Sequence, residues 1–183
     1  PRPPSSEWPG GGVAIGVGMS SEARRDLAER ELAVQATKRC RVAVCQAAGC
    51  LSTGAAAARA AFERSLDEAG LRDEVELFGT GCLGLCHAGP IVQVEPQGGE
   101  PLLYEHMDAV GATEVVAEHV AQGKVVTGRL AEGQQAFFAR QQRVVLENSG
   151  RSDPERIESC VAAGAYAALQ KVVTEMTPAE VVE

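Results

Sequence analysis

Alternating strand and helix patterns occupy the stretch from residue 40 to residue 123. Short runs of β-branched and apolar residues predict four strands, at residues 41–44, 75–78, 91–94 and 102–104. Between the first two strands, apolar positions at helical spacing predict a helix over 53–69 that Gly70 ends. After the fourth strand, the same spacing predicts a helix over 108–122. The order of elements is therefore βαβ followed by ββα.

This order restricts the topology of the sheet. A helical crossover makes the first two strands parallel, whereas the tight turn at residues 96–100 makes the last two antiparallel. We therefore predict the α/β class, with residues 40–130 forming a minimal thioredoxin-like core.

The segment before this core has a different character. Residues 1–20 are rich in proline, glycine and serine and read as an extended tail. Ser20 or Ser21 then caps a charged helix predicted over about 22–38. The apolar side of this helix is expected to carry Leu27, Ala28, Leu32, Val34 and Ala36. We assign residues 1–39 to an N-terminal tail and helix.

The segment after the core, residues 131–183, reads as helices separated by caps. One helix is predicted over 133–146, with Phe137 and Phe138 as its packing anchors. A second is predicted to start at the run Asp-Pro-Glu and to extend over 154–173. We expect this helical segment to be a linker.

A third helix start, Thr177-Pro178-Ala179-Glu180, lies close to the end of the sequence. Only a turn and a half of helix fits before Glu183, and so short a helix is not stable by itself. We therefore expect the chain to be the front end of a longer polypeptide.

Composition and charge exclude several classes of protein. A formal net charge of −8 argues against nucleic-acid binding, which needs a basic face. No apolar run approaches the roughly 18 residues of a membrane span, and no signal peptide is apparent. Six cysteines in a long chain with 45% hydrophobic residues do not fit a small disulfide scaffold. We therefore expect a reducing cytoplasm and no membrane insertion.

Two pairs of cysteines carry the chemistry of the sequence. Cys45 and Cys50 lie in VCQAAGC, and Cys82 and Cys86 lie in GTGCLGLC. Each pair follows one of the first two strands, and parallel strands end at the same edge of a sheet. Four thiolates converging from two loops form a metal site. The spacing favours a [2Fe–2S] cluster, in which each iron takes two thiolates.

Nearby glycines support this interpretation, because they let the backbone approach the sulfur atoms and direct N–H groups at them. These glycines are Gly49, Gly79, Gly81, Gly84 and Gly89. The run from 79 to 84 also matches the dinucleotide-binding pattern G-x-G-x-x-G. A strand follows it instead of the helix that pyrophosphate binding requires, so nucleotide binding is rejected.

Rival readings of the cysteines remain open. Four cysteines can hold a structural zinc ion, although the spacings here are less typical of zinc. Disulfides or empty thiols are further alternatives. A thiol–disulfide oxidoreductase would require C-x-x-C, which these two pairs lack.

Other candidate side chains receive structural roles. Cys40 and Cys160 are predicted to be buried apolar residues, on a strand and a helix respectively. His87 is interpreted as a loop residue near the cluster, and His106 and His119 as surface positions. Ser52 and Thr53 either donate hydrogen bonds to a sulfur or cap the adjacent helix.

The motifs VCQAAGC and GTGCLGLCHAGPIVQV, with the hairpin and helix that follow, resemble the thioredoxin-like [2Fe–2S] ferredoxins. This family includes the ferredoxin-type subunit of respiratory complex I and relatives in NAD-linked hydrogenases and formate dehydrogenases. The resemblance implies that Cys45, Cys50, Cys82 and Cys86 ligate the cluster. Residues 137–183 are similar to the segment leading into the flavin- and NADH-binding subunit of these enzymes.

The resemblance implies a one-electron transfer module of an NAD(P)-linked flavin–iron–sulfur oxidoreductase. Other subunits of a multi-subunit redox complex would be its partners. FMN and NAD(H) would bind the full-length protein outside this chain. The alternative is a Cys₄ zinc or apo thioredoxin-like scaffold that docks a larger redox subunit through the segment after residue 131.

Overall fold

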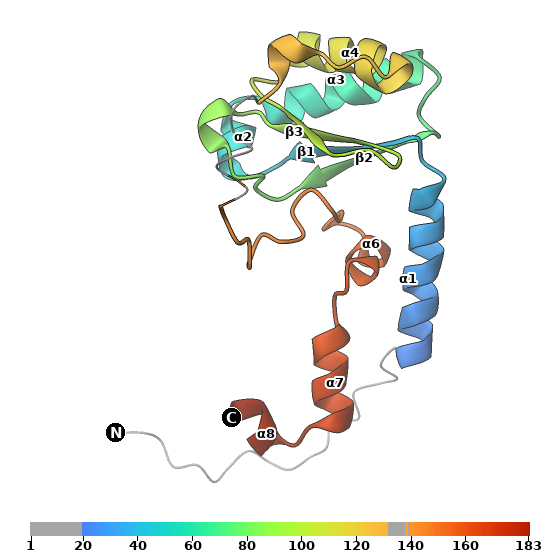
Figure 1. Cartoon of the computed structure of the whole chain (residues 1–183), viewed down its shortest axis with the longest axis vertical. Helices are drawn as coiled ribbons and strands as arrows, with labels where there is room; N and C mark the ends of the chain where they lie inside the picture. The colour runs from blue at the N-terminus through green and yellow to red at the C-terminus, as the bar shows by residue number, and fades with distance from the viewer. Residues whose placement is uncertain (1–19, 132–137, 139) are drawn as a thin grey trace.

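The computed structural model describes residues 20–131, 138 and 140–183. One mixed sheet has the strand order β2-β1-β3-β4 and lies in the upper part of Figure 1. The strands are β1 (Cys40–Cys45), β2 (Val75–Thr80), β3 (Val92–Pro96) and β4 (Leu102–Tyr104). β1 pairs with β2 in parallel, while β1 with β3 and β3 with β4 are antiparallel. The parallel and antiparallel pairs predicted from the sequence are confirmed.

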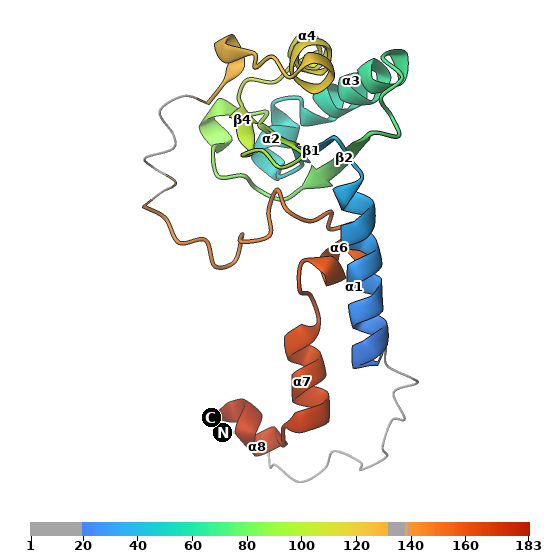
Figure 2. The ribbon, with the colours of Figure 1, turned by 45° about the vertical axis from the view of Figure 1, so that its right-hand side comes forward.

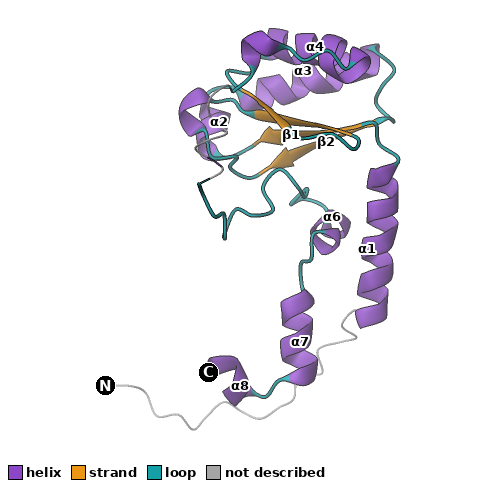
Figure 3. Ribbon diagram, viewed as in Figure 1, coloured by secondary structure: helices purple, strands orange, loops and turns teal. Residues whose placement is uncertain are grey.

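Two helices cover one face of this sheet, α3 (Ala55–Glu68) and α4 (Ala109–Val115) (Figure 3). α3 buries Phe62 and Leu66, as its apolar spacing predicts. Asp108 caps α4, and its Oδ1 accepts a hydrogen bond from the backbone N–H of Gly111 at 2.7 Å. The helix continues as a π-helical turn, η2 (Val116–Val120). The core lies between these helices and the central strands.

The helix predicted over 53–69 corresponds to α3, and a separate short helix that the sequence pattern did not predict precedes it. α2 (Ala48–Ser52) comes first, and α3 begins after Gly54, whose φ of +106° interrupts the helical path. Glycine reaches this left-handed conformation without the steric cost that a side chain imposes. The break matters for function because α2 carries Cys50.

α1 (Ser21–Ala36) begins as predicted but packs differently. Ser20 caps it, and its Oγ accepts a hydrogen bond from the N–H of Ala23 at 3.1 Å. The predicted apolar side is wrong, since Leu32 and Val34 are each 51% exposed while Glu31 is buried. Glu31 is buried because a cation from the far end of the chain, Arg156, neutralises it.

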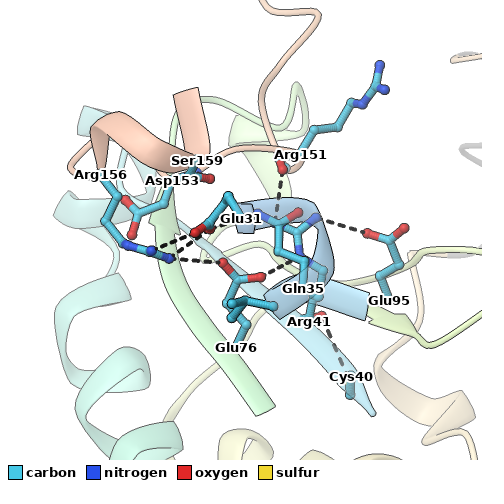
Figure 4. A network of polar contacts seen from close by, with 12 residues as sticks. Glu31, Gln35, Cys40, Arg41, Glu76, Glu95, Arg151, Asp153, Arg156 and Ser159 are labelled. Carbon is cyan, nitrogen blue, oxygen red and sulfur yellow. Dashed lines mark hydrogen bonds and ion pairs between the residues drawn. The ribbon is translucent and has the colours of Figure 1, made fainter. Parts of the chain in front are cut away.

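Arg156 makes two hydrogen bonds to the Glu31 carboxylate, at 3.0 and 2.8 Å, and lies 3.7 Å from Glu76 on β2 (Figure 4). On β1, Arg41 pairs with Glu76 at 2.6 Å and approaches Glu95 of β3 to 3.9 Å. The strand register places Arg41 directly between these two glutamates. The second face of the sheet is therefore charged, and the charges tie α1 and the C-terminal segment to it.

The C-terminal segment is less helical than predicted. The predicted helix over 133–146 is wrong for residues 140–146, which form turns and irregular structure, while 133–137 and 139 lie outside the described residues. The helix predicted over 154–173 is wrong as one element. It is split into α6 (Ile157–Ala162) and α7 (Ala167–Glu175).

The split occurs where Gly164 and Tyr166 adopt left-handed backbone conformations, which end helices. α7 lies beside α1, where Arg24 donates a hydrogen bond to Gln170 at 3.0 Å (Figure 2). The last helix start is confirmed: Thr177 and Glu180 form a capping box at α8 (Pro178–Val182).

The burial of two side chains, His119 and Cys160, differs from the prediction. His119, expected at the surface, is buried and shares a 2.8 Å hydrogen bond with the hydroxyl of Tyr104. Cys160, expected in the interior, is only half-buried, and its thiol donates to the carbonyl of Asp153 at 3.4 Å.

Across the described ranges, no helix combines the length and apolar character needed to cross a bilayer.

Candidate metal centre

The carboxyl ends of β1 and β2 bring the two cysteine pairs to one edge of the sheet. Cys45 is the last residue of β1 and lies opposite Thr80, the last residue of β2. The N–H of Gln46 donates to the carbonyl of Thr80 at 2.8 Å, which holds the two strand ends together. Cys82 follows Thr80 by two residues. The parallel pairing therefore determines where both loops begin.

The second cysteine of each pair lies on a short helix next to this edge. Cys50 is on α2, and Cys86 opens η1 (Cys86–Ala88), a 3₁₀ turn. The Sγ atoms of Cys82 and Cys86 are 3.5 Å apart. The predicted site residues thus lie on β1, α2, the loop after β2 and η1, next to one edge of the sheet.

Gly89 marks the close approach of the two pairs. A Cβ at this position would lie 3.2 Å from the Sγ of Cys50 and 3.5 Å from the carbonyl oxygen of Cys86. A Cβ on Gly49 would in turn lie 3.5 Å from the Cβ of Cys86. The close approach at Cys50 therefore depends on Gly89 having no side chain, whereas a Cβ on Gly49 would make ordinary van der Waals contact with Cys86.

Solvent exposure divides the four cysteines into an inner and an outer pair. Cys45 and Cys50 are each 1% exposed, whereas Cys82 is half-buried and Cys86 is exposed. Cys45 and Cys50 belong to a buried apolar cluster, from which water is excluded and which also contains Leu83, Leu85, Ala88 and Ile91. The site is therefore open to solvent on the side of Cys82 and Cys86.

Crowding of the thiols opposes their ionisation. The pKa of Cys50 is raised to about 11, chiefly by burial; a backbone hydrogen bond from Ile91 lowers it, and the neighbouring Cys45 and Cys86 add to the increase. The pKa of Cys86 is raised chiefly by its hydrogen bond with Cys82 and by the charge of that thiol. Cationic iron would reverse this effect, because ligand thiols bind metal as thiolates and release their protons.

Gly84 supplies the hydrogen bond to sulfur that the glycine pattern predicts. Its N–H donates to the Sγ of Cys82 at 3.3 Å, from a backbone with φ of +97°. Ser52 and Thr53 neither donate a hydrogen bond to a sulfur nor cap the helix that follows. Both hydroxyls donate instead to the backbone carbonyl of Gly49 in α2, at 2.8 Å from Ser52 and 3.1 Å from Thr53.

The remaining side chains lie as follows. His87 is exposed beside Cys86. Cys40 is buried at the opposite end of β1, as predicted, and burial raises its pKa to about 12. Cys40 and Cys45 are the first and last residues of β1, which places them about 16 Å apart at the usual rise of a strand. Cys40 therefore takes no part in the site.

The donor set fits a two-iron cluster. Cys45 with Cys50 and Cys82 with Cys86 form two contacting pairs, and each iron of a [2Fe–2S] cluster takes two thiolates. Within the described part of the chain, no three histidine, cysteine, aspartate or glutamate side chains are arranged around a single metal-ion position. The assignment of the four cysteines as ligands stays a prediction.

Sequence reasoning missed a second layer of contacts around the loop that carries Cys82. Gly150 donates its N–H to the hydroxyl of Thr80 at 2.7 Å, and Arg143 donates to the carbonyl of Leu83 at 3.3 Å. These partners are 70 and 60 residues apart in the chain, so no local pattern signals them.

Comparison with known proteins gives consistent results. Residues 30–119 match the family described as thioredoxin-like [2Fe-2S] ferredoxin. A curated protein of Clostridium pasteurianum, "Ferredoxin, 2Fe-2S", is 41% identical over 61 residues, which are 33% of this chain and 57% of that protein. The chain thus spans just over half the length of this relative.

Solved structures of a thioredoxin-like [2Fe-2S] ferredoxin from Aquifex aeolicus also resemble the chain. One superimposes with a TM-score of 0.45 at 24% identity, covering 51% of this chain and 90% of that one. Another, of the wild-type protein, has a TM-score of 0.45 at 23% identity and covers 51% and 97%. The family match together with the observed strand order confirms the predicted fold class.

Proposed function

We propose that the chain binds one [2Fe–2S] cluster and transfers single electrons, from the premise that residues 30–119 match the thioredoxin-like [2Fe-2S] ferredoxin family. One observation carries the proposal: four thiols, from the end of β1, the loop after β2 and two short helices, lie together as two pairs at one sheet edge. When bound, such a cluster accepts and releases one electron at a time.

The chain's own residues would prepare this edge for electron transfer. Cys45 and Cys50 would hold the buried side, and Cys82 and Cys86 the side that faces solvent. The apolar lining limits water, and the N–H of Gly84 would stabilise negative charge on the sulfur of Cys82. A redox partner would exchange electrons from the solvent side, where the path to the outer pair is short.

Metal analysis tests the proposal directly. Purified anaerobically, the protein should be reddish-brown and contain about two irons and two sulfides per chain, as a [2Fe–2S] centre implies. Replacing Cys45 or Cys82 by serine should reduce the iron content and alter the EPR signal of the reduced protein. Cys160→Ser is the matched control, since Cys160 lies outside the site, and it should retain the wild-type iron content.

The same measurement separates the proposal from the scaffold alternative. A colourless protein with one zinc per chain, or with no metal, would contradict electron transfer and favour a docking role. Cys82→Ser then gives a second distinction. Loss of electron transfer with assembly intact supports the electron-transfer module, whereas loss of assembly without a redox defect supports the scaffold.

We further propose that this domain works within an NAD(P)-linked flavin–iron–sulfur oxidoreductase in the cytoplasm. The support is the similarity of residues 137–183 to the segment before the flavin- and NADH-binding subunit. FMN and NAD(H) would bind elsewhere in the full-length protein, and other subunits would pass electrons to or from the cluster.

The native complex provides the test of this finer proposal. In protein isolated from its own cells, addition of NADH or NADPH should produce the EPR signal of the reduced cluster. A cluster that dithionite reduces but neither nucleotide does would contradict the NAD(P) assignment while leaving cluster binding intact.

A further inference from the structure

A segment outside the matched ferredoxin region lies along the loop that carries Cys82. We call this segment the strap and define it as residue 138 with residues 140–151. It lies against four of the five loop residues from Thr80 to Gly84, two of them through the hydrogen bonds from Gly150 and Arg143. A Cβ on Gly81 would lie 3.0 Å from the Oγ of Ser149. The strap therefore forms one side of the loop.

The contact made by Arg143 bears directly on a ligand sulfur. Its Nη2 donates to the carbonyl of Leu83 at 3.3 Å, and the N–H of Gly84 donates to the Sγ of Cys82 at 3.3 Å. This carbonyl and this N–H belong to one peptide group. A cation at the oxygen polarises the peptide and makes its N–H a stronger donor, because hydrogen bonds in series strengthen one another.

Phe138 holds the guanidinium of Arg143 in place. The Cζ of Arg143 lies 4.5 Å from the centroid of the Phe138 ring, a cation–π contact. The same ring packs against Gly84, where a Cβ would approach it to 3.1 Å. One ring thus contacts both the cation and the glycine whose peptide the cation polarises.

Gly150 anchors the other end of the strap. Its carbonyl accepts a hydrogen bond from Gln93 on β3 at 3.0 Å, in addition to the bond from its N–H to Thr80. Its φ is +84°, and a Cβ there would lie 2.6 Å from the Oε1 of Gln93. The strap is therefore attached to the sheet at a position whose left-handed backbone and close neighbours favour glycine.

We propose that Arg143 is a positioning residue for the cluster: it orients and polarises the Leu83–Gly84 peptide that hydrogen-bonds to Cys82. This inference rests on the proposed function. A stronger hydrogen bond and a nearby cation both stabilise the reduced cluster, which carries one more negative charge. The strap thereby keeps the reduction potential higher than the ferredoxin domain alone would set it.

Redox titration of the cluster-loaded chain tests this inference with three variants. Arg143→Gln should shift the midpoint potential to more negative values. The expected shift is a threefold to tenfold change in the ratio of oxidised to reduced protein, about 30 to 60 mV for a one-electron couple. Arg143→Lys keeps the charge and should recover most of the shift. Arg39→Gln removes the same charge at the opposite end of β1 and should leave the potential unchanged.

A substitution at Thr80 tests the attachment of the strap through Gly150 without changing the charge of Arg143. Thr80→Val removes the acceptor of the Gly150 N–H while preserving side-chain shape, so it should loosen the strap and shift the potential in the same direction. The EPR spectrum of Arg143→Gln should also change, because the hydrogen bond to one ligand sulfur weakens.

The outcomes distinguish this inference from the proposed function. Wild-type protein without two irons and two sulfides would contradict the function. A loaded wild type with Arg143→Gln at the wild-type potential would contradict the inference alone. Equal loss of iron in Arg143→Gln and Arg143→Lys, without a shift of potential in the loaded fraction, would show a merely structural role and also overturn it.

Discussion

Replacing Arg156 by methionine should destabilise the attachment of α1 to the sheet. Glu31 is 5% exposed, and Arg156 gives it two hydrogen bonds, at 3.0 and 2.8 Å. Breaking a fully buried pair from one side costs about 3–5 kcal/mol, because the remaining charge stays unpaired. Arg156 is 43% exposed, and Gln35 still donates to Glu31 at 3.0 Å. Solvent screening and this hydrogen bond reduce the expected cost to about 2 kcal/mol.

Urea unfolding followed by far-UV circular dichroism, under anaerobic reducing conditions, measures this cost. The thermal midpoint should fall by about 4–8 °C for a chain of this length. Hydrogen exchange should speed up first in the amides of α1. Methionine retains the apolar packing of the arginine stem, so the loss reports the charge and its hydrogen bonds.

An exposed ion pair provides the matched control. Arg39 and Glu74 approach to 3.3 Å with side chains 42% and 55% exposed, so Arg39→Met should cost under about 1 kcal/mol. The double variant Glu31→Gln with Arg156→Met should recover most of the stability lost in Arg156→Met. If Arg156→Met costs no more than Arg39→Met, the argument that burial of Glu31 depends on Arg156 is wrong.

Three further predictions concern pH, packing and capping. Burial lowers the pKa of His119 in the folded protein. The stability that the neutral imidazole contributes is therefore present above pH 6.5, the pKa in the unfolded chain, and is lost as the pH falls below that value. His119→Gln should reduce the loss of unfolding free energy between pH 7 and pH 5, measured from unfolding curves. Gly89→Ala would crowd the Sγ of Cys50 and should accelerate iron release, whereas Gly128→Ala, with no atom within 4 Å of the new Cβ, should not. Asp108→Ala removes the cap of α4 and should cost about 1 kcal/mol in urea unfolding, while asparagine at that position should largely preserve it.

Some features follow from the sequence because their causes are local. The cap residues Ser20, Asp108 and Thr177 each accept a hydrogen bond from the backbone N–H three residues ahead, and these helix starts are where the pattern predicts them. The β-branched runs predicted the strands, and the helical crossover and the tight turn predicted the pairing of β1 with β2 and of β3 with β4, which are also local features. Cysteine spacing after two parallel strands was enough to predict that the two pairs meet.

Local patterns predict the wrong side chains to be buried where a contact from a distant part of the chain makes burial of a polar side chain favourable. The apolar spacing of α1 predicts burial of Leu32 and Val34, yet Arg156 makes burial of Glu31 favourable instead. His119 reads as a polar surface residue, yet its hydrogen bond to Tyr104 allows it to be buried.

The sequence by itself determined the strand and helix order, the helix caps and the position of four thiols at one edge of a sheet. Only the tertiary structure decided what surrounds those thiols: which pair is buried, how closely α2 and η1 approach, and that Arg143 and Gly150 support the loop of Cys82. The physical reason is distance along the chain. A hydrogen bond between residues 60 or 70 positions apart depends on how the whole chain packs, and no neighbouring residue encodes it.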